Sequence, residues 1–277
     1  SGSPERGRQM GVYRGIGSVA YAVGALIGGR LADRSGIAAS LIFAAISVGS
    51  GALLAARLHP GPRPRPTLTS ALEAVVESTS PRSTAAARTT LPRIFLVGVI
   101  LVMAALSASS SMFPLYLNSL GRSRTAIGSL GALTAVLEFP AMYFTGILSD
   151  AIGRAPLLAA GAGAIALVQI FYIGAARVSF SVVLGQLTRS FGYASFTANA
   201  MSYTADLSGE NDRAANSGLF TLMQNVGQLA GMLLGGVLAQ LLGFGALFAF
   251  CAVTALCAAL AFYALSRSHP HHKATPN

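Results

Sequence analysis

The sequence contains few charged residues, because Lys, Arg, Asp and Glu together make up only 10% of its 277 residues. A soluble globular domain carries about 25%. Hydrophobic residues reach 53%, and the mean hydropathy is +0.61. A water-soluble chain of this size cannot bury so much apolar surface, whereas a lipid bilayer accepts it. The composition therefore excludes a soluble globular protein and indicates an integral membrane protein.

Motifs that carry covalent chemistry are also lacking. The two cysteines, Cys251 and Cys257, lie inside an apolar run and read as small lipid-facing or core-facing residues. The sequence contains no nucleotide-binding P-loop, catalytic triad or metal-ligand cluster. We therefore expect no enzymatic activity, no cofactor and no metal. The net charge of +10 does not indicate nucleic-acid binding, because the positive residues are spread between apolar blocks.

Long apolar stretches follow one another along the chain and predict about eight transmembrane helices, each of which needs about 20 apolar residues. The stretches cover residues 15–31, 37–56, 94–121, 126–149, 155–176, 178–205 and 214–266. The last one is too long for a single span, and we expect it to break at Gly243, Phe244 and Gly245. The predicted fold class is an all-α, polytopic membrane protein.

The distribution of arginine and lysine predicts the orientation of these helices. When the loops are assigned alternately to two sides, one side carries thirteen of the 19 basic residues and the other carries five. The richer side is expected to be cytoplasmic, so both ends of the chain should lie in the cytoplasm. Segment 57–92, which is rich in proline and arginine, is expected to be a cytoplasmic linker. An amphipathic surface helix within it is an equal alternative.

An internal repeat gives more information about the fold. Residues 24–32 resemble residues 231–239, and the shared glycines are Gly24, Gly28, Gly29, Gly231, Gly235 and Gly236. If the match is real, the first and seventh helices are equivalent, and six helices separate one repeat from the next. Parallel repeats of six helices are the arrangement found in the major facilitator fold.

Residues 146–154 resemble the signature cytoplasmic loop of the major facilitator superfamily, G-x-L-x-D-x-x-G-R. The matching positions are Gly146, Asp150, Gly153 and Arg154. The resemblance implies a twelve-helix transporter of which this chain is helices 5–12. Residues 1–56 would end the N-terminal half, residues 93–266 would form the C-terminal six-helix half, and residues 267–277 would be a cytoplasmic tail. The four N-terminal helices would be missing partners, and we expect no transport by the chain alone.

The segment from Gly24 to Gly29 resembles the G-P-x-x-G-G motif of helix 5 in proton antiporters, with Ala25 in place of the proline. Residues 29–36 also resemble the signature loop, which is cytoplasmic in the family. However, one predicted helix separates them from the arginine-rich linker, which is expected to be cytoplasmic. Asp33 is therefore expected on the outer side of the membrane, and we reject this second match. The altered helix 5 motif leaves the direction of transport open.

Two charged residues fall deep within predicted helices: Glu138 and Arg189. Glu138 lies twelve residues into its helix, roughly 18 Å, and Arg189 lies eleven residues into its own, roughly 17 Å. Ionised groups at such depth are costly and mark functional sites. We expect the two residues to form a pair or a shared site for proton coupling. The alternative is a purely structural ion pair.

Several polar side chains on helices expected to border a central cavity are candidate substrate contacts: Asn118, Gln186, Tyr193, Asn199, Gln224 and Gln228. Ordinary hydrogen bonds between helices would explain each of them equally well. The predicted function is proton-coupled efflux of small amphipathic molecules across the plasma or inner membrane, by antiport. Proton-coupled import of a sugar or an organic acid is the alternative. A membrane-embedded enzyme or receptor is disfavoured by the missing catalytic constellation.

Overall fold

The computed structural model describes residues 4–58, 91–175, 178, 180–209 and 212–268, and the side chains of 4–16, 18, 58, 150 and 268 lie outside the description. Helices account for almost all of this part of the chain. They are α1 (Pro4–Ser35), α2 (Ile37–Leu58), α5 (Arg93–Ser119), α6 (Arg124–Ile152), α7 (Arg154–Gly174), α8 (Phe180–Asp206) and α9 (Arg213–Ser268). The predicted linker at 57–92 lies almost wholly outside the described residues.

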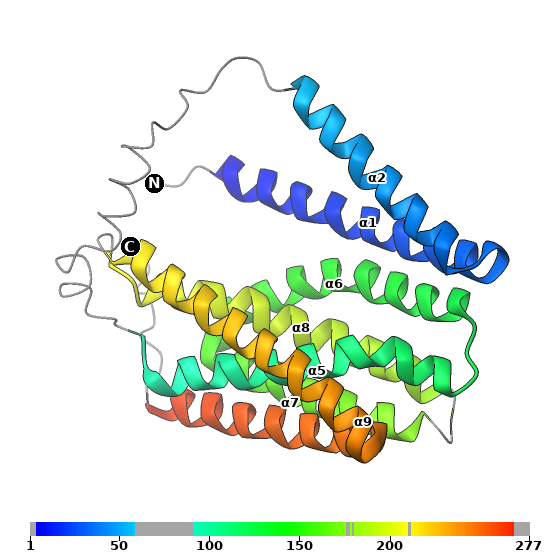
Figure 1. The fold of residues 1–277 in the computed structure, drawn as a ribbon. Coiled ribbons are helices and arrows are strands. Elements are labelled where there is room, and N and C mark those ends of the chain that lie inside the picture. The colour runs from blue at the N-terminus through cyan, green and yellow to red at the C-terminus, as the bar shows by residue number, and fades with distance from the viewer. Residues whose placement is uncertain (1–3, 59–90, 176–177, 179, 210–211, 269–277) are drawn as a thin grey trace, which may run out of the picture.

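Helix α9 consists of two antiparallel helices joined at Gly243. This glycine has φ +82°, a conformation that a residue with a Cβ rarely adopts, so the chain turns back there. In Figure 1 the second part of α9 returns alongside α5 toward the side of the bundle from which α9 started. Once α9 is divided, the described helices number eight, which confirms the predicted number and the predicted break.

Five of the described helices are long and apolar enough to cross a membrane: α2, α5, α6, α7 and α9. The apolar stretch in α9 covers 55 residues, which suffices for two spans. Helix α8 is less apolar because it carries polar side chains such as Gln186, Ser190 and Asn199, all buried inside the bundle. The chain is therefore an all-helical, multi-pass membrane protein.

The main core lies among α5, α7, α8 and α9. Its largest fully buried side chains include Phe95, Tyr172, Phe248 and Phe262, and Phe95 lies 6.2 Å from Phe262 between ring centroids. Aromatic rings at such separations pack edge-on or tilted and add to the burial of their apolar area. These four helices form one body, which Figure 1 shows below α6.

Helices α1 and α2 lie on one side of this body. Helix α1 packs along α6, where Ala22 faces Ala132 and Ala135, and α2 packs on α1 alone among the described elements. No described side chain of α2 is buried, and residues such as Leu41 and Val48 are exposed to the surroundings. Small residues on α1 and α6 allow the two backbones to approach closely. Helix α6 therefore stands between the main body and the α1–α2 pair.

Candidate functional site

Glu138 on α6 and Arg189 on α8 are both half-buried, and the two helices pack directly against each other. Arg189 Nη2 donates a hydrogen bond to Ser110 Oγ on α5 at 3.2 Å. Glu138 is close enough to Arg189 to be affected by its charge. Within the described part of the chain, however, no ion pair joins the two side chains. The structure thus brings together the two charged residues singled out from the sequence, but holds them short of a direct contact.

A layer of buried hydrogen bonds lies one helical turn from this pair. Thr134 Oγ1 on α6 donates to Gln186 Oε1 on α8 at 2.7 Å, and both side chains are 2% exposed. Ser190 Oγ donates to the Thr134 carbonyl oxygen at 3.3 Å. These bonds connect α6 and α8 beside the charged residues.

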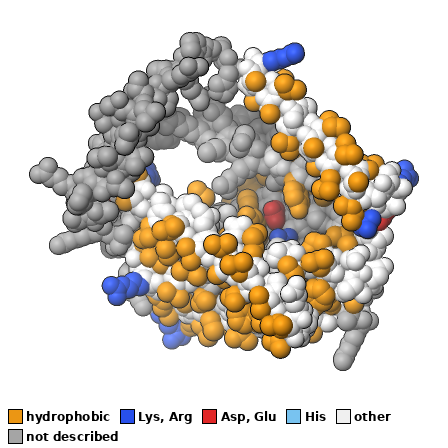
Figure 2. Space-filling model, viewed as in Figure 1, with side chains coloured by type: hydrophobic (Ala, Val, Ile, Leu, Met, Phe, Trp, Pro, Cys, Tyr) orange, Lys and Arg blue, Asp and Glu red, His pale blue; other side chains and the backbone are white. Residues whose placement is uncertain are grey.

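One face of the molecule is hollowed beside the α1–α2 pair. Figure 2 shows an acidic side chain and atoms of a basic side chain next to each other at the floor of this hollow, surrounded by hydrophobic and neutral atoms. Opposite charges on the floor of this hollow form a local polar site, where a ligand or a proton can interact with both of them.

The remaining candidate substrate contacts lie in different surroundings. Tyr193 and Gln224 are half-buried, and Gln228 is exposed, while its backbone oxygen accepts from Ser107 Oγ at 2.9 Å. Asn199 is buried, and its Nδ2 donates at 2.7 Å to the Ser195 carbonyl oxygen of the same helix. Gln186 is occupied by the buried layer described above. The structure therefore does not gather these residues into one cluster, and their contact with substrate stays a prediction.

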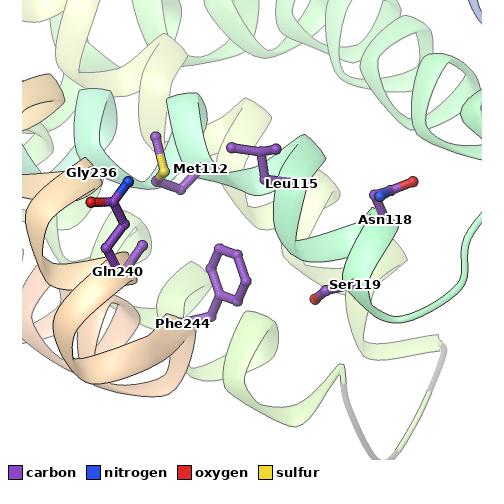
Figure 3. Close-up of a pocket in the computed structure, with 8 residues that line it drawn as sticks. Met112, Leu115, Asn118, Ser119, Gly236, Gln240 and Phe244 are labelled. Carbon is purple, nitrogen blue, oxygen red and sulfur yellow. The ribbon is translucent and has the colours of Figure 1, made fainter.

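Two pockets lie near the C-terminal end of α5. One, of about 300 Å³, is lined by residues of α5 and α9, including Met112, Asn118, Gln240 and Phe244 (Figure 3). The other, of about 390 Å³, is lined by α1, α2, α5 and α6, and it also contains Asn118. Neither pocket includes Glu138 or Arg189. Asn118 is thus the one predicted contact that faces both of these spaces.

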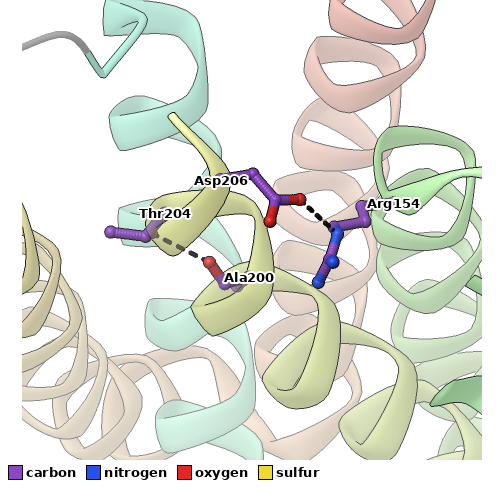
Figure 4. Close-up of polar contacts among 4 residues, drawn as sticks. All are labelled: Arg154, Ala200, Thr204 and Asp206. Carbon is purple, nitrogen blue, oxygen red and sulfur yellow. Dashed lines mark hydrogen bonds and ion pairs between the residues drawn. The ribbon is translucent and has the colours of Figure 1, made fainter. Parts of the chain in front are cut away.

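The signature loop joins α6 to α7 and ends in an ion pair. Gly153 has φ +91° and separates the two helices, so that Arg154 begins α7. The Arg154 guanidinium pairs with the Asp206 carboxylate at the C-terminal end of α8 (Figure 4). Gly146 has no neighbour near its Cβ position, and the Asp150 side chain lies outside the description. Sequence reasoning missed Asp206, although its place at the predicted end of the helix 178–205 could have signalled a partner for Arg154.

A second polar contact, also missed, joins the ends of α1 and α6. Asp33 Oδ1 accepts from the Arg124 amide at 3.0 Å, and Oδ2 accepts from the Thr125 amide at 2.7 Å. Arg124 Nη1 donates in return to the Ala32 carbonyl oxygen at 2.9 Å. Hydrogen bonds from the Thr125 side chain and backbone lower the pKa of Asp33, which lies beyond the apolar segment 15–31. We call this arrangement the Asp33 clasp.

The glycines of the repeat have unequal neighbours. Gly231 and Gly235 of α9 press against Ala104 and Ala108 of α5 so closely that a side chain would overlap the α5 backbone. Gly29 of α1 lies equally close to the start of α6. Gly24, Gly28 and Gly236 have no described atom within 4 Å of a Cβ position. The two copies of the motif therefore share a sequence pattern but not a packing environment.

Comparison with known families gives a match over the whole length. A family model described as Major Facilitator Superfamily matches residues 1–121 and, in a second match, residues 94–277. A search of curated proteins found no match.

Proposed function

This chain belongs to the major facilitator superfamily, a family of secondary transporters, and we propose that it couples the movement of a small molecule to the movement of protons. The observation that carries the proposal is the arrangement of Glu138 and Arg189. They are half-buried on adjacent helices, and no ion pair joins them within the described chain. A buried carboxyl that is not tied to a cation can take up and release a proton.

Protonation of Glu138 would change the net charge of the site from zero to +1. A change of one unit charge in a weakly polar environment alters which ligand and which conformation are favoured. Alternate protonation on the two sides of the membrane would then drive the transporter through its cycle. Because Ala25 replaces the proline of the antiporter motif, the motif does not decide the direction of transport, and proton-coupled efflux is the first of the two directions that we propose.

Arg189 supports a second candidate. Its positive charge repels a cationic substrate and attracts a carboxylate, with which a guanidinium forms two parallel hydrogen bonds. Among the described residues, its side chain makes one hydrogen bond, to Ser110. Proton-coupled import of an organic acid is therefore the alternative that the site chemistry favours, and a sugar importer receives no comparable support.

Two polar contacts are suited to a change of access. The Asp33 clasp ties α1 to the N-terminal end of α6, and the Arg154–Asp206 pair ties α7 to α8. If the arginine-rich loops are cytoplasmic, the clasp lies on the outer side and the ion pair on the inner side of the plasma membrane. Opening the outer side would require α1 to separate from α6, and this separation would break the hydrogen bonds of Asp33.

The open glycines of α1 support the proposal that further helices of the same transporter pack there. Gly231 and Gly235 press against α5, while their counterparts Gly24 and Gly28 face open space. A helix equivalent to α5 would fill that space by the same close approach. The four helices that would complete an N-terminal half are the partners that we propose for this surface.

Transport measurements on the complete transporter that contains this chain would test the proposal. In proteoliposomes with an imposed pH gradient, the gradient should drive uptake or release of a substrate from a test panel. The variant Glu138→Gln should lose this response, while the control Asp212→Asn, which changes a carboxylate at the start of α9, should keep it. An unchanged response of Glu138→Gln to the gradient would contradict the assignment of Glu138 to proton coupling.

A further inference from the structure

We propose that the buried hydrogen bond between Thr134 and Gln186 is a positioning device that holds the Glu138 carboxyl away from the Arg189 guanidinium, so that Glu138 stays available to protons. We call this bond and the adjoining Ser190 contact the α6–α8 clamp. The proposal rests on the function proposed above, because it explains how the same two charged residues are kept in a working arrangement.

The geometry of the clamp is that of a rigid link. The Thr134–Gln186 bond is 2.7 Å long, and both side chains are almost fully shielded from solvent. Ser190 Oγ also donates to the backbone carbonyl oxygen of the same threonine at 3.3 Å. Breaking a buried bond of this kind leaves polar groups without a partner, which is unfavourable. Sliding or rotation of α6 against α8 is therefore opposed at this level.

The clamp lies close to the two charged residues along both helices. Thr134 and Glu138 are four residues apart on α6, and Gln186 and Arg189 are three residues apart on α8. Residues with these spacings lie on one face of a helix, one turn apart, at a rise of about 5–6 Å. The clamp therefore sets the register in which Glu138 and Arg189 face each other.

Arg189 is also held from the other side. Its Nη2 donates to Ser110 Oγ on α5 at 3.2 Å, which directs the guanidinium toward α5. With α6 fixed by the clamp and Arg189 held toward α5, the two charged groups remain in electrostatic contact without forming an ion pair. A direct ion pair would keep the carboxylate ionised and make it a poor proton carrier.

The surroundings of Glu138 contain few other groups that could set its protonation. Of the helices packed on α6, α8 contributes Arg189, whose charge acts on Glu138 and also on Tyr172 of α7. Helix α5 contributes the neutral Ser110. On α1, among the described side chains, Tyr21 lies near Gly131, about two turns from Glu138. Among the described charges, Arg189 is thus the one whose distance from Glu138 decides how readily Glu138 takes up a proton.

The test removes the clamp without removing either charged residue. In Gln186→Leu and Thr134→Val the side chains keep roughly the same size but lose the hydrogen bond. We expect α6 and α8 to slip, Glu138 and Arg189 to form an ion pair, and the pH midpoint of proton-driven transport to fall by about one unit or more. The double variant Gln186→Leu/Arg189→Gln should not show this fall.

Two control variants separate the clamp from general loss of packing. Gln169→Leu removes another fully buried glutamine, which bonds to Ser109 on α5. Thr188→Val removes a hydroxyl that bonds only to Leu184 within α8. Both controls should leave the pH midpoint in place, even if they reduce the amount of folded protein. Equal shifts in controls and clamp variants would overturn the proposal.

A second measurement does not depend on transport. The infrared band of the protonated Glu138 carboxyl can be titrated in the purified complete transporter in lipid nanodiscs and assigned by its loss in Glu138→Gln. Its midpoint should fall in Gln186→Leu and Thr134→Val. If it falls while transport shows no proton coupling, the clamp is supported and the proposed function is refuted. If it does not move in folded clamp variants, the clamp proposal is refuted whatever the transport result.

Discussion

Replacing Gly29 by alanine should separate α1 from α6, whereas the same change at Gly28 should not. A Cβ at Gly29 would lie 2.7 Å from the Arg124 carbonyl oxygen and 3.1 Å from the Thr125 Cα, both of which are backbone atoms. Ordinary contacts begin near 3.4 Å, so α1 must withdraw by about 0.7 Å. A Cβ at Gly28 meets nothing within 4 Å. Because both positions are within helix α1, the gain in helix propensity is the same for the two variants.

The size of the effect of Gly29→Ala depends on which contacts are strained when α1 moves away from α6. Overpacking against backbone costs about 1–3 kcal/mol, and an outward shift also lengthens the bonds from Arg124 and Thr125 to Asp33, now 3.0 and 2.7 Å. A change of about 1–3 kcal/mol alters an equilibrium between closed and open arrangements by about 5- to 150-fold. The population with α1 and α6 separated should rise by a factor in this range in Gly29→Ala.

Spin-label distances between α1 and α7 would measure this population. Labels at Val23→Cys and Ile170→Cys use positions that are 48% and 58% exposed, in a background with Cys251 and Cys257 replaced by serine. Gly29→Ala should add or enlarge a long-distance component, and Gly28→Ala should match the parent. Identical distance distributions for the two alanine variants would refute the close-packing argument.

Two further predictions concern the polar contacts. The pKa of Asp33 is lowered from its ordinary 3.8, so its carboxylate stabilises the α1–α6 contact above that pH, and the contribution is lost as the pH falls through the lower folded-state pKa. The same labels should therefore show separation on acidification from about pH 7 to about pH 3, and Asp33→Asn should show it already at neutral pH. The Arg154–Asp206 side chains are 30% and 52% exposed, so a double-mutant cycle with Arg154→Gln and Asp206→Asn should give a coupling of about 0.2–1 kcal/mol, reduced by salt. A coupling that does not respond to salt would contradict the exposed position of this pair.

Helix existence and most helix ends could be predicted because the apolar runs are long and are interrupted by glycine or by charge. The expected segment 37–56 corresponds to Ile37–Leu58, and the break at Gly243 falls where expected. The start of α1 was placed eleven residues too late, since the helix begins at Pro4 and not near residue 15. Hydropathy detects the part of a helix that suits lipid, and a polar extension of the same helix gives no such signal.

The polar contacts could not be predicted in the same way. Glu138 and Arg189 can be found from the sequence because a charged residue stands out within an apolar run. Their similar depth in the membrane follows from counting residues from the start of each predicted helix. The Asp33 clasp joins residues 91 positions apart, and no local pattern tells an exposed aspartate from one that accepts two amides. Gln186 is a predicted substrate contact, yet its bond to Thr134 follows from helix packing that the sequence does not display.

The repeat explains why equivalent sequence need not mean equivalent contacts. Two glycines four residues apart lie on one face of a helix and make a flat strip there. The strip permits a neighbouring helix to approach closely, but it does not determine which helix does so. In α9 that strip is filled by Ala104 and Ala108, because α5 is present beside it. In α1 the neighbouring Gly29, and not Gly28, lies against α6, because α6 approaches from a different direction. The motif therefore marks where a helix can dock, whereas the identity of the neighbour depends on how the other helices are arranged around it.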